Sequence, residues 1–147
     1  MRSEAQEAAY VEFVTARQTH LRRIAYALCG DWQRADALLG QALTRLYVAW
    51  PRQQREGTEE VFIRRAILRG ADDVCSPTGR PDPGRGELFA ALQSLPLPQR
   101  KVAVLRHWLG LSAQETASDL GATARSVETQ ADLARTALEG LSARGEP

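Results

Sequence analysis

The sequence predicts an all-α protein built from two small helical modules that are joined by a linker rich in proline and glycine. Apolar residues recur at steps of three and four along most of the chain, and no segment alternates with the period of two that a half-buried strand requires. Residues 76–86 (SPTGRPDPGRG) contain three prolines and three glycines, which disfavour both helix and strand. We therefore expect one module at 1–75, a linker at 76–86 and a second module at 87–147.

The first half of the N-terminal module is predicted to form two helices. Ser3 can cap a helix that runs to about residue 17, with Gln6 at the position of a capping box. A second helix is expected over about 18–29, with apolar residues along one side. Gly30 is placed to end it.

The second half of this module is also predicted to form two helices. Asp31 can cap the most regular helix in the sequence, and Pro51 is expected to stop it. A polar loop is expected at 52–57. Thr58 can then cap a further helix that ends near residue 75.

The C-terminal module is predicted to end in a helix-turn-helix. Ser112 and Glu115 have the spacing of a capping box, and Gly121 follows as the turn residue. A short helix, a glycine-containing turn and a longer second helix match the helix-turn-helix pattern, although helical hairpins without a DNA function look similar. The expected helices cover about 87–94, 98–109, 113–120 and 124–140.

Composition and length narrow the class of protein. Hydrophobic residues make up 44% of the chain and charged residues 25%, as in a globular domain. No run approaches the roughly 18 apolar residues of a membrane span, and the N-terminus lacks a signal-peptide pattern, so we expect a cytoplasmic location. The net charge of +1 gives no argument for nucleic acid binding.

The chain offers little for metal binding or catalysis. Cys29 and Cys75 are too few and too far apart to suggest a disulfide framework, and only His20 and His107 could join them as zinc ligands. We expect two reduced core thiols, no metal site and no cofactor. The sequence lacks a glycine-rich phosphate loop, a His-Glu-x-x-His motif and a Gly-x-Ser-x-Gly elbow, so an enzyme is not expected.

Two segments carry residues suited to nucleic acid. Arg65 and Arg69 share a helical face that Arg64 adjoins, which suits a phosphate backbone but equally suits a solvated face. Asp72 and Asp73 lie near the end of the same helix, where the helix dipole disfavours negative charge, so a partner cation is expected there.

In the last helix, a stripe of apolar residues predicts the buried face (Val127, Ala131, Ala134, Leu138 and Leu141). Arg125, Ser126 and Thr129 would then face outward near the helix N-terminus, where they suit phosphate or base-edge contacts. Glu128 and Asp132 share this outward face. The helix carries two arginines against three acids over residues 124–139, so it should bind DNA weakly on its own.

Two stretches resemble the extracytoplasmic-function (ECF) RNA polymerase sigma factors, within the sigma-70 family and of the short actinobacterial type. Residues 27–50 (ALCGDWQRADALLGQALTRLYVAW) are similar to the family's Gly-Asp-x-x-x-Ala-Glu-Asp-Leu-Val-Gln-Glu segment and the helix after it. Residues 92–130 (LQSLPLPQRKVAVLRHWLGLSAQETASDLGATARSVETQ) are similar to the family's region 4. With the weaker middle included, the resemblance spans nearly the whole chain.

The resemblance implies a region 2-like domain that grips core RNA polymerase and recognises the −10 element, and a region 4-like helix-turn-helix that reads the −35 element. It implies core polymerase and promoter DNA as partners, with an anti-sigma factor or another regulatory protein as a further candidate. The implied polymerase-binding residues are Asp36, Leu38, Leu39, Leu43 and Arg45. The implied DNA-binding residues are Arg64, Arg65, Arg69, Asp73, Arg125, Ser126 and Thr129.

The chain departs from the family pattern at positions that contact polymerase or DNA, whereas its packing positions are kept. The family has its second acid where this chain has Ala37, and Gln-Glu where it has Gly40-Gln41. It has a basic pair at the position of Val48-Ala49 and an asparagine at that of Arg69. In the last helix it has basic residues where this chain has Glu128 and Leu133. These changes leave three hypotheses. The chain is a sigma factor with a divergent promoter preference, a sigma-like protein that acts through protein contacts alone, or a helical DNA-binding regulator unrelated to polymerase.

Overall fold

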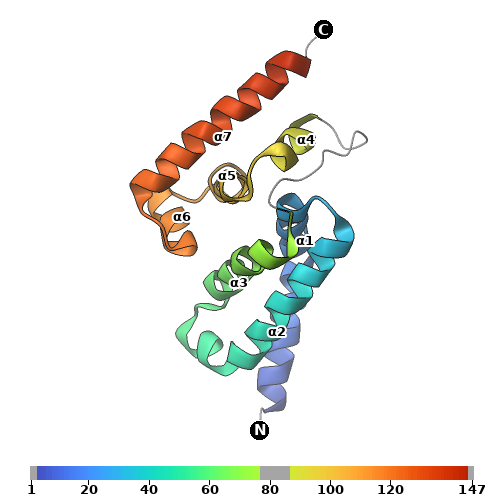
Figure 1. Cartoon of the computed structure of the whole chain (residues 1–147). Helices are drawn as coiled ribbons and strands as arrows, with labels where there is room; N and C mark the ends of the chain where they lie inside the picture. Colours follow the sequence, from blue (N-terminus) through green and yellow to red (C-terminus); the bar gives the residue numbers. More distant parts are fainter. Residues whose placement is uncertain (1–2, 77–86, 146–147) are drawn as a thin grey trace.

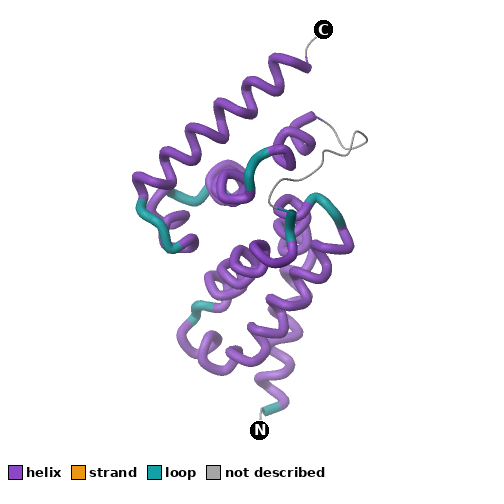
Figure 2. The backbone as a smooth tube through the Cα atoms, viewed as in Figure 1, coloured by secondary structure: helices purple, strands orange, loops and turns teal. Residues whose placement is uncertain are grey.

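The computed structural model describes residues 3–76 and 87–145, and these residues form helices with no strand (Figures 1 and 2). The all-α prediction is confirmed. In Figure 1, α1–α3 form one bundle and α4–α7 form a second group that lies against one end of it. The elements are α1 (Glu4–Cys29), α2 (Trp32–Glu56), α3 (Glu59–Val74), α4 (Glu87–Ser94), α5 (Leu97–Ala103), the π-helical turn η1 (Val104–Trp108), α6 (Ala113–Leu120) and α7 (Ala124–Gly145).

The two helices that the sequence predicts before Gly30 are one continuous helix, α1. Its ends are as expected: Ser3 and Gln6 form the capping box, and Gly30 has a φ of 74°. The predicted break near residue 17 is wrong. No glycine or proline lies there, and extending a helix costs less than nucleating a new one.

The prediction that Pro51 stops α2 is also wrong, because the helix continues through the expected loop to Glu56 and ends at Gly57. A proline inside a helix removes one backbone hydrogen bond and costs about 3 kcal/mol. The neighbouring Trp50 is buried and packs on Phe13 and Tyr10, with ring centroids 5.4 and 5.5 Å away. Burial of such a large ring contributes about 3 kcal/mol and offsets the cost.

Cys29 and Cys75 form a disulfide, so the expectation of two reduced thiols is wrong. Cys29 is the last residue of α1 and Cys75 directly follows α3. The two lie 46 residues apart in sequence, but the ends of α1 and α3 meet, and their Cα atoms are 4.6 Å apart. That distance lies within the range for bridged cysteines.

The C-terminal module contains the predicted helix-turn-helix. The capping box of Ser112 and Glu115 begins α6, and Gly121 ends it with a φ of 66°. In α7, Val127 and Ala134 are buried as predicted, and Ala131 and Leu138 are partly buried. The side chain of Leu141 lies outside the described residues.

The two groups of helices share one hydrophobic core. Leu97, Val104 and Leu105 of α5 and η1 belong to the same buried cluster as residues of α1, α2 and α3. Most of the expected linker, residues 77–86, lies outside the described residues. The predicted module boundaries therefore stay a prediction, and the described parts of the chain pack as one body.

Candidate nucleic-acid interface

The basic cluster predicted on α3 faces α6. Arg64 forms two hydrogen bonds with the carboxylate of Asp119, one from Nε and one from Nη2 at 3.2 Å. Arg65 donates from Nε to the same carboxylate at 3.2 Å. The Asp119 side chain is 1% exposed, whereas Arg64 and Arg65 keep 19% and 37%. One buried carboxylate thus occupies both guanidinium groups.

Arg69 and Asp73, the other predicted DNA-binding residues of α3, are exposed. Neither forms an ion pair with another described residue. The structure therefore separates the predicted set into a covered pair and an open pair. The covered pair holds the better phosphate ligands, because Asp73 repels phosphate.

A second ion pair joins the two groups of helices. Lys101 of α5 donates from Nζ to Asp72 of α3 at 2.7 Å, and its side chain is only 10% exposed. The sequence predicts a partner cation for Asp72 and Asp73, and Lys101 is that partner for Asp72. Lys101 and Asp119 thus contact α3 at two points from two different helices.

The predicted DNA-facing residues of α7 are exposed near its N-terminus. Thr129 donates from its hydroxyl to the backbone carbonyl of Arg125 at 3.0 Å, and the amide of Ser126 donates to the Thr123 hydroxyl at 3.0 Å. Arg125 forms no ion pair with another described residue. Its guanidinium is exposed and, among these residues, unpaired, whereas the other described arginine of α7, Arg135, is exposed but paired with Asp132.

The predicted polymerase-binding residues of α2 fall into two groups. Leu38 and Leu39 are buried in the core, so their side chains are not exposed to a partner in this arrangement; their role in polymerase binding stays a prediction. Asp36 and Arg45 are exposed and Leu43 is partly buried. Asp36 and Leu43 flank the buried stripe of α2 on one side, and Arg45 flanks it on the other.

Asp36 is paired with Arg22 of α1 through two hydrogen bonds of 2.8 and 3.2 Å. The hydrogen bond from Arg22 lowers the pKa of Asp36 below its ordinary value, and the same bond raises the pKa of Arg22. The carboxylate is therefore charged near neutral pH. Because the pair is solvent-exposed, a partner can compete for either member at low cost.

Arg100 is a residue that the sequence analysis did not single out. It is the second residue of the Gln99-Arg100 pair in the stretch that resembles region 4, and its side chain is fully buried. Its Nη1 atom donates to the Leu28 carbonyl at 2.5 Å, and its Nη2 atom donates to the Leu95 carbonyl at 2.9 Å. Burial lowers the pKa of Arg100, although a guanidinium stays charged at neutral pH. Its helical spacing from Leu97, Ala103 and Val104, which places it on the apolar side of α5, was the available signal.

An apolar pocket of about 630 Å³ lies between α4, η1 and α7. It forms where the backbone takes one π-helical turn, seen in the 3.0 Å bond from the Leu109 amide to the Val104 carbonyl. Such turns occur frequently at functional sites. Trp108 lines the pocket and is 50% exposed. The other apolar residues that line it are Phe89, Leu92, Ala103, Val104 and Leu138.

Within the described residues, no three His, Cys, Asp or Glu side chains gather where they could hold a metal ion. Across residues 3–76 and 87–145, no helix combines the length and the apolar character needed to cross a bilayer.

Comparisons with known proteins identify the family. The pattern described as Sigma-70, region 4 matches residues 85–138. The RNA polymerase sigma-E factor of Streptomyces coelicolor is 31% identical over 138 residues, with 82% of this chain and 78% of that protein covered. The sigma-E factor of Streptomyces avermitilis is 32% identical over 140 residues, with 82% and 77% covered.

A solved structure has a similar fold. The sigma factor RpoE of Bartonella quintana, crystallised with the anti-sigma factor NepR, superposes with a TM-score of 0.63 at 18% identity, over 94% of this chain and 99% of that one. At that identity the match supports the fold alone. The sequence relatives support the first of the three hypotheses, and nothing among them favours the other two. The chain belongs to the RNA polymerase sigma factors, as an ECF sigma factor of actinobacterial type.

Proposed function

We propose that this chain directs core RNA polymerase to promoter DNA in the cytoplasm, and that the compact arrangement described here is its closed, resting form. The observation that carries the proposal is the contact of Arg64 and Arg65 with Asp119. A carboxylate occupies the two cations that would otherwise bind phosphate. In the closed form Arg64 and Arg65 of α3 are therefore withheld from DNA.

Opening this contact has a cost that a partner must meet. A hydrogen bond to a charged group contributes about 1.5–3 kcal/mol, and Asp119 accepts three of them from α3. A cost of that size makes the open form a minor population and lowers the apparent affinity for DNA by the same factor. Binding to polymerase, which prefers the open form, would supply the difference.

Two surfaces remain accessible to polymerase in the closed form. One is the exposed part of α2, with Asp36 and Leu43 on one side of its buried stripe and Arg45 on the other. The other is the pocket beside Trp108, which offers the kind of aromatic anchor that protein interfaces favour. An anti-sigma factor is a candidate competitor, because the structural neighbour is described in complex with one.

Co-elution and transcription test the proposal directly. The full chain should co-elute with core polymerase from a Streptomyces and should yield promoter-specific run-off transcripts from genomic fragments. Co-elution without any transcript would contradict promoter recognition and favour a role through protein contacts. DNA binding that does not depend on polymerase would favour an unrelated regulator.

A double variant assigns the role of α3. Arg64→Gln with Arg65→Gln should keep co-elution and lose most of the transcript, since phosphate contacts provide much of DNA affinity. Arg52→Gln with Arg55→Gln is the matched control, because both residues are exposed at the end of α2. Equal transcript from both double variants would show that α3 does not contact the promoter.

A further inference from the structure

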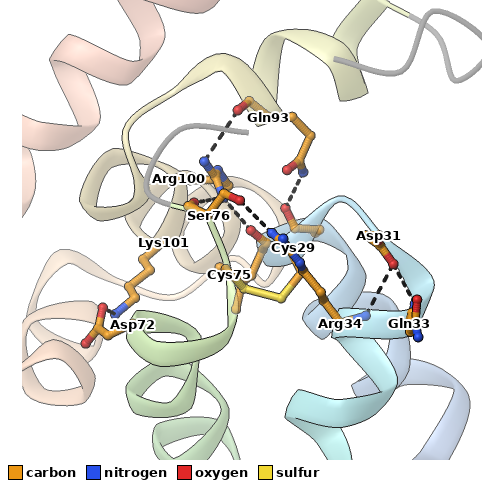
Figure 3. Close-up of a disulfide and its surroundings, with 12 residues drawn as sticks. Cys29, Asp31, Gln33, Arg34, Asp72, Cys75, Ser76, Gln93, Arg100 and Lys101 are labelled. Carbon is orange, nitrogen blue, oxygen red and sulfur yellow. Dashed lines mark hydrogen bonds and ion pairs between the residues drawn. A yellow bond between two sulfur atoms is a disulfide. The ribbon is translucent and has the colours of Figure 1, made fainter. Parts of the chain in front are cut away.

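The Cys29–Cys75 disulfide lies at the contact between the two groups of helices (Figure 3). Both cysteines are buried, with 6% and 5% of their surfaces exposed. The bridge joins the end of α1 to the end of α3. In Figure 3, Arg100 of α5 and Gln93 of α4 extend toward the residues on either side of it.

The residues next to each cysteine hold the buried guanidinium of Arg100. The Leu28 carbonyl, one residue before Cys29, accepts from Nη1 at 2.5 Å, and the Ser76 carbonyl, one residue after Cys75, accepts from the same atom at 3.3 Å. One cation of α5 thus requires two carbonyls that belong to separate segments. The disulfide sets the spacing of those segments.

Further contacts hold the segments on either side of the disulfide in place. Gln93 donates from Nε2 to the Ala27 carbonyl at 2.7 Å, and a Cβ atom at Gly30 would lie 2.5 Å from Gln93 Oε1. Ser76 Oγ accepts from Arg34 of α2 at 2.5 Å. The end of α1 is therefore closely packed by α4, and the segment after α3 is tied to α2.

A buried guanidinium depends strongly on its acceptors, because an unpaired buried charge is far more costly than an unpaired exposed one. If the ends of α1 and α3 separate, Leu28 and Ser76 can no longer both reach Arg100. The position of α5 then loses its main polar anchor. Lys101, the next residue, pairs with Asp72 and would loosen with it.

We propose that the Cys29–Cys75 bridge is a redox-controlled clasp, which in its oxidised form holds α5 and α6 against α3 and on reduction lets them separate. The consequence for DNA rests on the proposed function, in which Arg64 and Arg65 are released from Asp119. Disulfides in reducing compartments are rare, and those that occur are mostly transient or redox-sensing. A cytoplasmic sigma factor with such a bridge fits that class.

The chemistry is a two-electron exchange with a dithiol protein or small dithiol. A thiolate of the donor attacks one Sγ atom, the Sγ–Sγ bond breaks, and a mixed disulfide forms while the other cysteine leaves as a thiolate. The second donor thiol then attacks the mixed disulfide and releases the first cysteine. The donor ends as a disulfide, and its two protons and two electrons are on Cys29 and Cys75. An oxidised dithiol reverses the exchange.

Burial of the bridge makes the coupling reciprocal. The cysteines are only 6% and 5% exposed, so a reductant reaches the sulfur atoms when the structure around them opens. If reduction favours opening, then by linkage anything that favours opening makes the bridge easier to reduce at equilibrium.

The test compares the oxidised and the dithiothreitol-reduced full chain. Alkylation and mass measurement count the free thiols, small-angle scattering gives the radius of gyration, and fluorescence anisotropy gives the affinity for duplex DNA. A compact chain of this length has a radius near about 15 Å. We expect the reduced form to be larger and to bind DNA at least about tenfold more tightly, because opening frees Arg64 and Arg65 from three charged hydrogen bonds to Asp119 and the loss of even one implies that factor.

Two variants separate the bridge from its consequence. Cys29→Ser with Cys75→Ser should match the reduced wild type and should not respond to dithiothreitol. Arg100→Met keeps the bridge but lacks the anchored cation, so it should be open in both redox states. If the cysteine variant fails to fold, reduction of the wild type under circular dichroism carries the test.

Two results would overturn the clasp. One is a pair of alkylatable thiols in chain that has been equilibrated with an oxidised dithiol. The other is an identical radius for the oxidised and reduced forms. If the radius changes with redox state and neither form supports transcription, the clasp stands and the proposed function fails.

Discussion

Helices α3 and α7 are the two segments suited to DNA, and they are limited in opposite ways. On α3, Arg64 and Arg65 are held by the buried carboxylate of Asp119 from another helix. On α7, Arg125 is exposed, but Glu128 is exposed beside it. Arg64 and Arg65 of α3 are paired with a buried carboxylate, whereas Arg125 of α7 is exposed but lies beside an acidic residue of its own helix.

The difference separates two kinds of control over DNA affinity. The limit on α3 is conditional, because it disappears when α6 moves away. The limit on α7 is fixed, because the acids belong to the same helical face and move with it. A partner or a redox change can therefore raise the affinity of α3, while only a change of sequence raises that of α7.

The largest effect is expected from Arg100→Met, which removes the cation beneath the contact between α5 and the N-terminal bundle. The carbonyls of Leu28 and Leu95 would lose a charged donor at 2.5 and 2.9 Å. We expect the free energy of unfolding to fall by roughly 3–5 kcal/mol, the usual cost of breaking a buried charged contact. Urea unfolding followed by circular dichroism measures it.

The matched control is Arg106→Met, since Arg106 donates to one carbonyl, that of Leu111, at 2.9 Å. Its loss should cost only about 1 kcal/mol. Equal losses in the two variants would mean that Arg100 does not anchor the closed form, and α3 would then be covered by Asp119 alone.

The next effect is expected from Asp119→Asn, which acts on α3 and leaves α7 unchanged. Loss of the carboxylate weakens the hold on Arg64 and Arg65, so DNA affinity should rise about tenfold, as the loss of one charged hydrogen bond implies. The slope of log affinity against log salt should steepen by up to about 2, because two arginines become available to phosphates. Anisotropy titrations over a salt series measure both.

Glu56→Gln is the control for Asp119→Asn, because it makes the same change in net charge in an exposed surface pair with Arg52. It should leave DNA binding unchanged. A folded Asp119→Asn protein with unchanged affinity would show that Asp119 does not restrain α3.

A smaller effect is expected from Glu128→Lys, which acts on α7 alone. The side chain is exposed near Arg125, so one added phosphate contact should raise affinity several-fold and steepen the salt slope by about 1. Glu12→Lys, an equal charge change on the exposed side of α1, serves as control. If the two variants bind DNA equally, α7 does not face DNA. The gain should be the same in oxidised and reduced protein, unlike the gain from Asp119→Asn.

The sequence predicted the features that depend on neighbours a few residues away. The capping box of Ser112 and Glu115 and the left-handed Gly121 were both expected, because each is set by the backbone within one turn. The need for a cation beside Asp72 follows from the helix dipole, but Lys101, which supplies it, lies 29 residues away and was not identified from the sequence. These signals are local, and so they survive without knowledge of the fold.

The features that control α3 could not be predicted, because they join distant segments. Cys29 and Cys75 are 46 residues apart, Arg64 and Asp119 are 55 apart, and Arg100 and Leu28 are 72 apart. The first pairing depends on how α1 packs beside α3, and the other two on how α4–α7 dock on α1–α3; no periodicity encodes either arrangement. The burial of Leu38 and Leu39 was not foreseen for a related reason: the resemblance marks the helix but not which of its sides faces the core.

The smallest effect is expected from acid, acting on α6 through Glu115. Hydrogen bonds from the Ser112 backbone and then its side chain lower the pKa of Glu115 below its ordinary value near 4.5. A lowered pKa stabilises the folded state above that ordinary value, and the stabilisation is lost as the pH falls through the folded pKa. Because α6 carries Asp119, loss of this stabilisation should also weaken the contact of Asp119 with Arg64 and Arg65 of α3. The exposure of the α7 residues should not change.

Hydrogen exchange of α6 amides between about pH 6 and pH 3 tests this, after correction for the intrinsic exchange rate. Protection should fall a few-fold more in the wild type than in Glu115→Gln, because glutamine also completes a capping box but does not titrate. Glu56→Gln, far from α6 on α2, should behave as the wild type. If Glu115→Gln loses protection at the same pH as the wild type, the acid sensitivity of α6 does not come from Glu115.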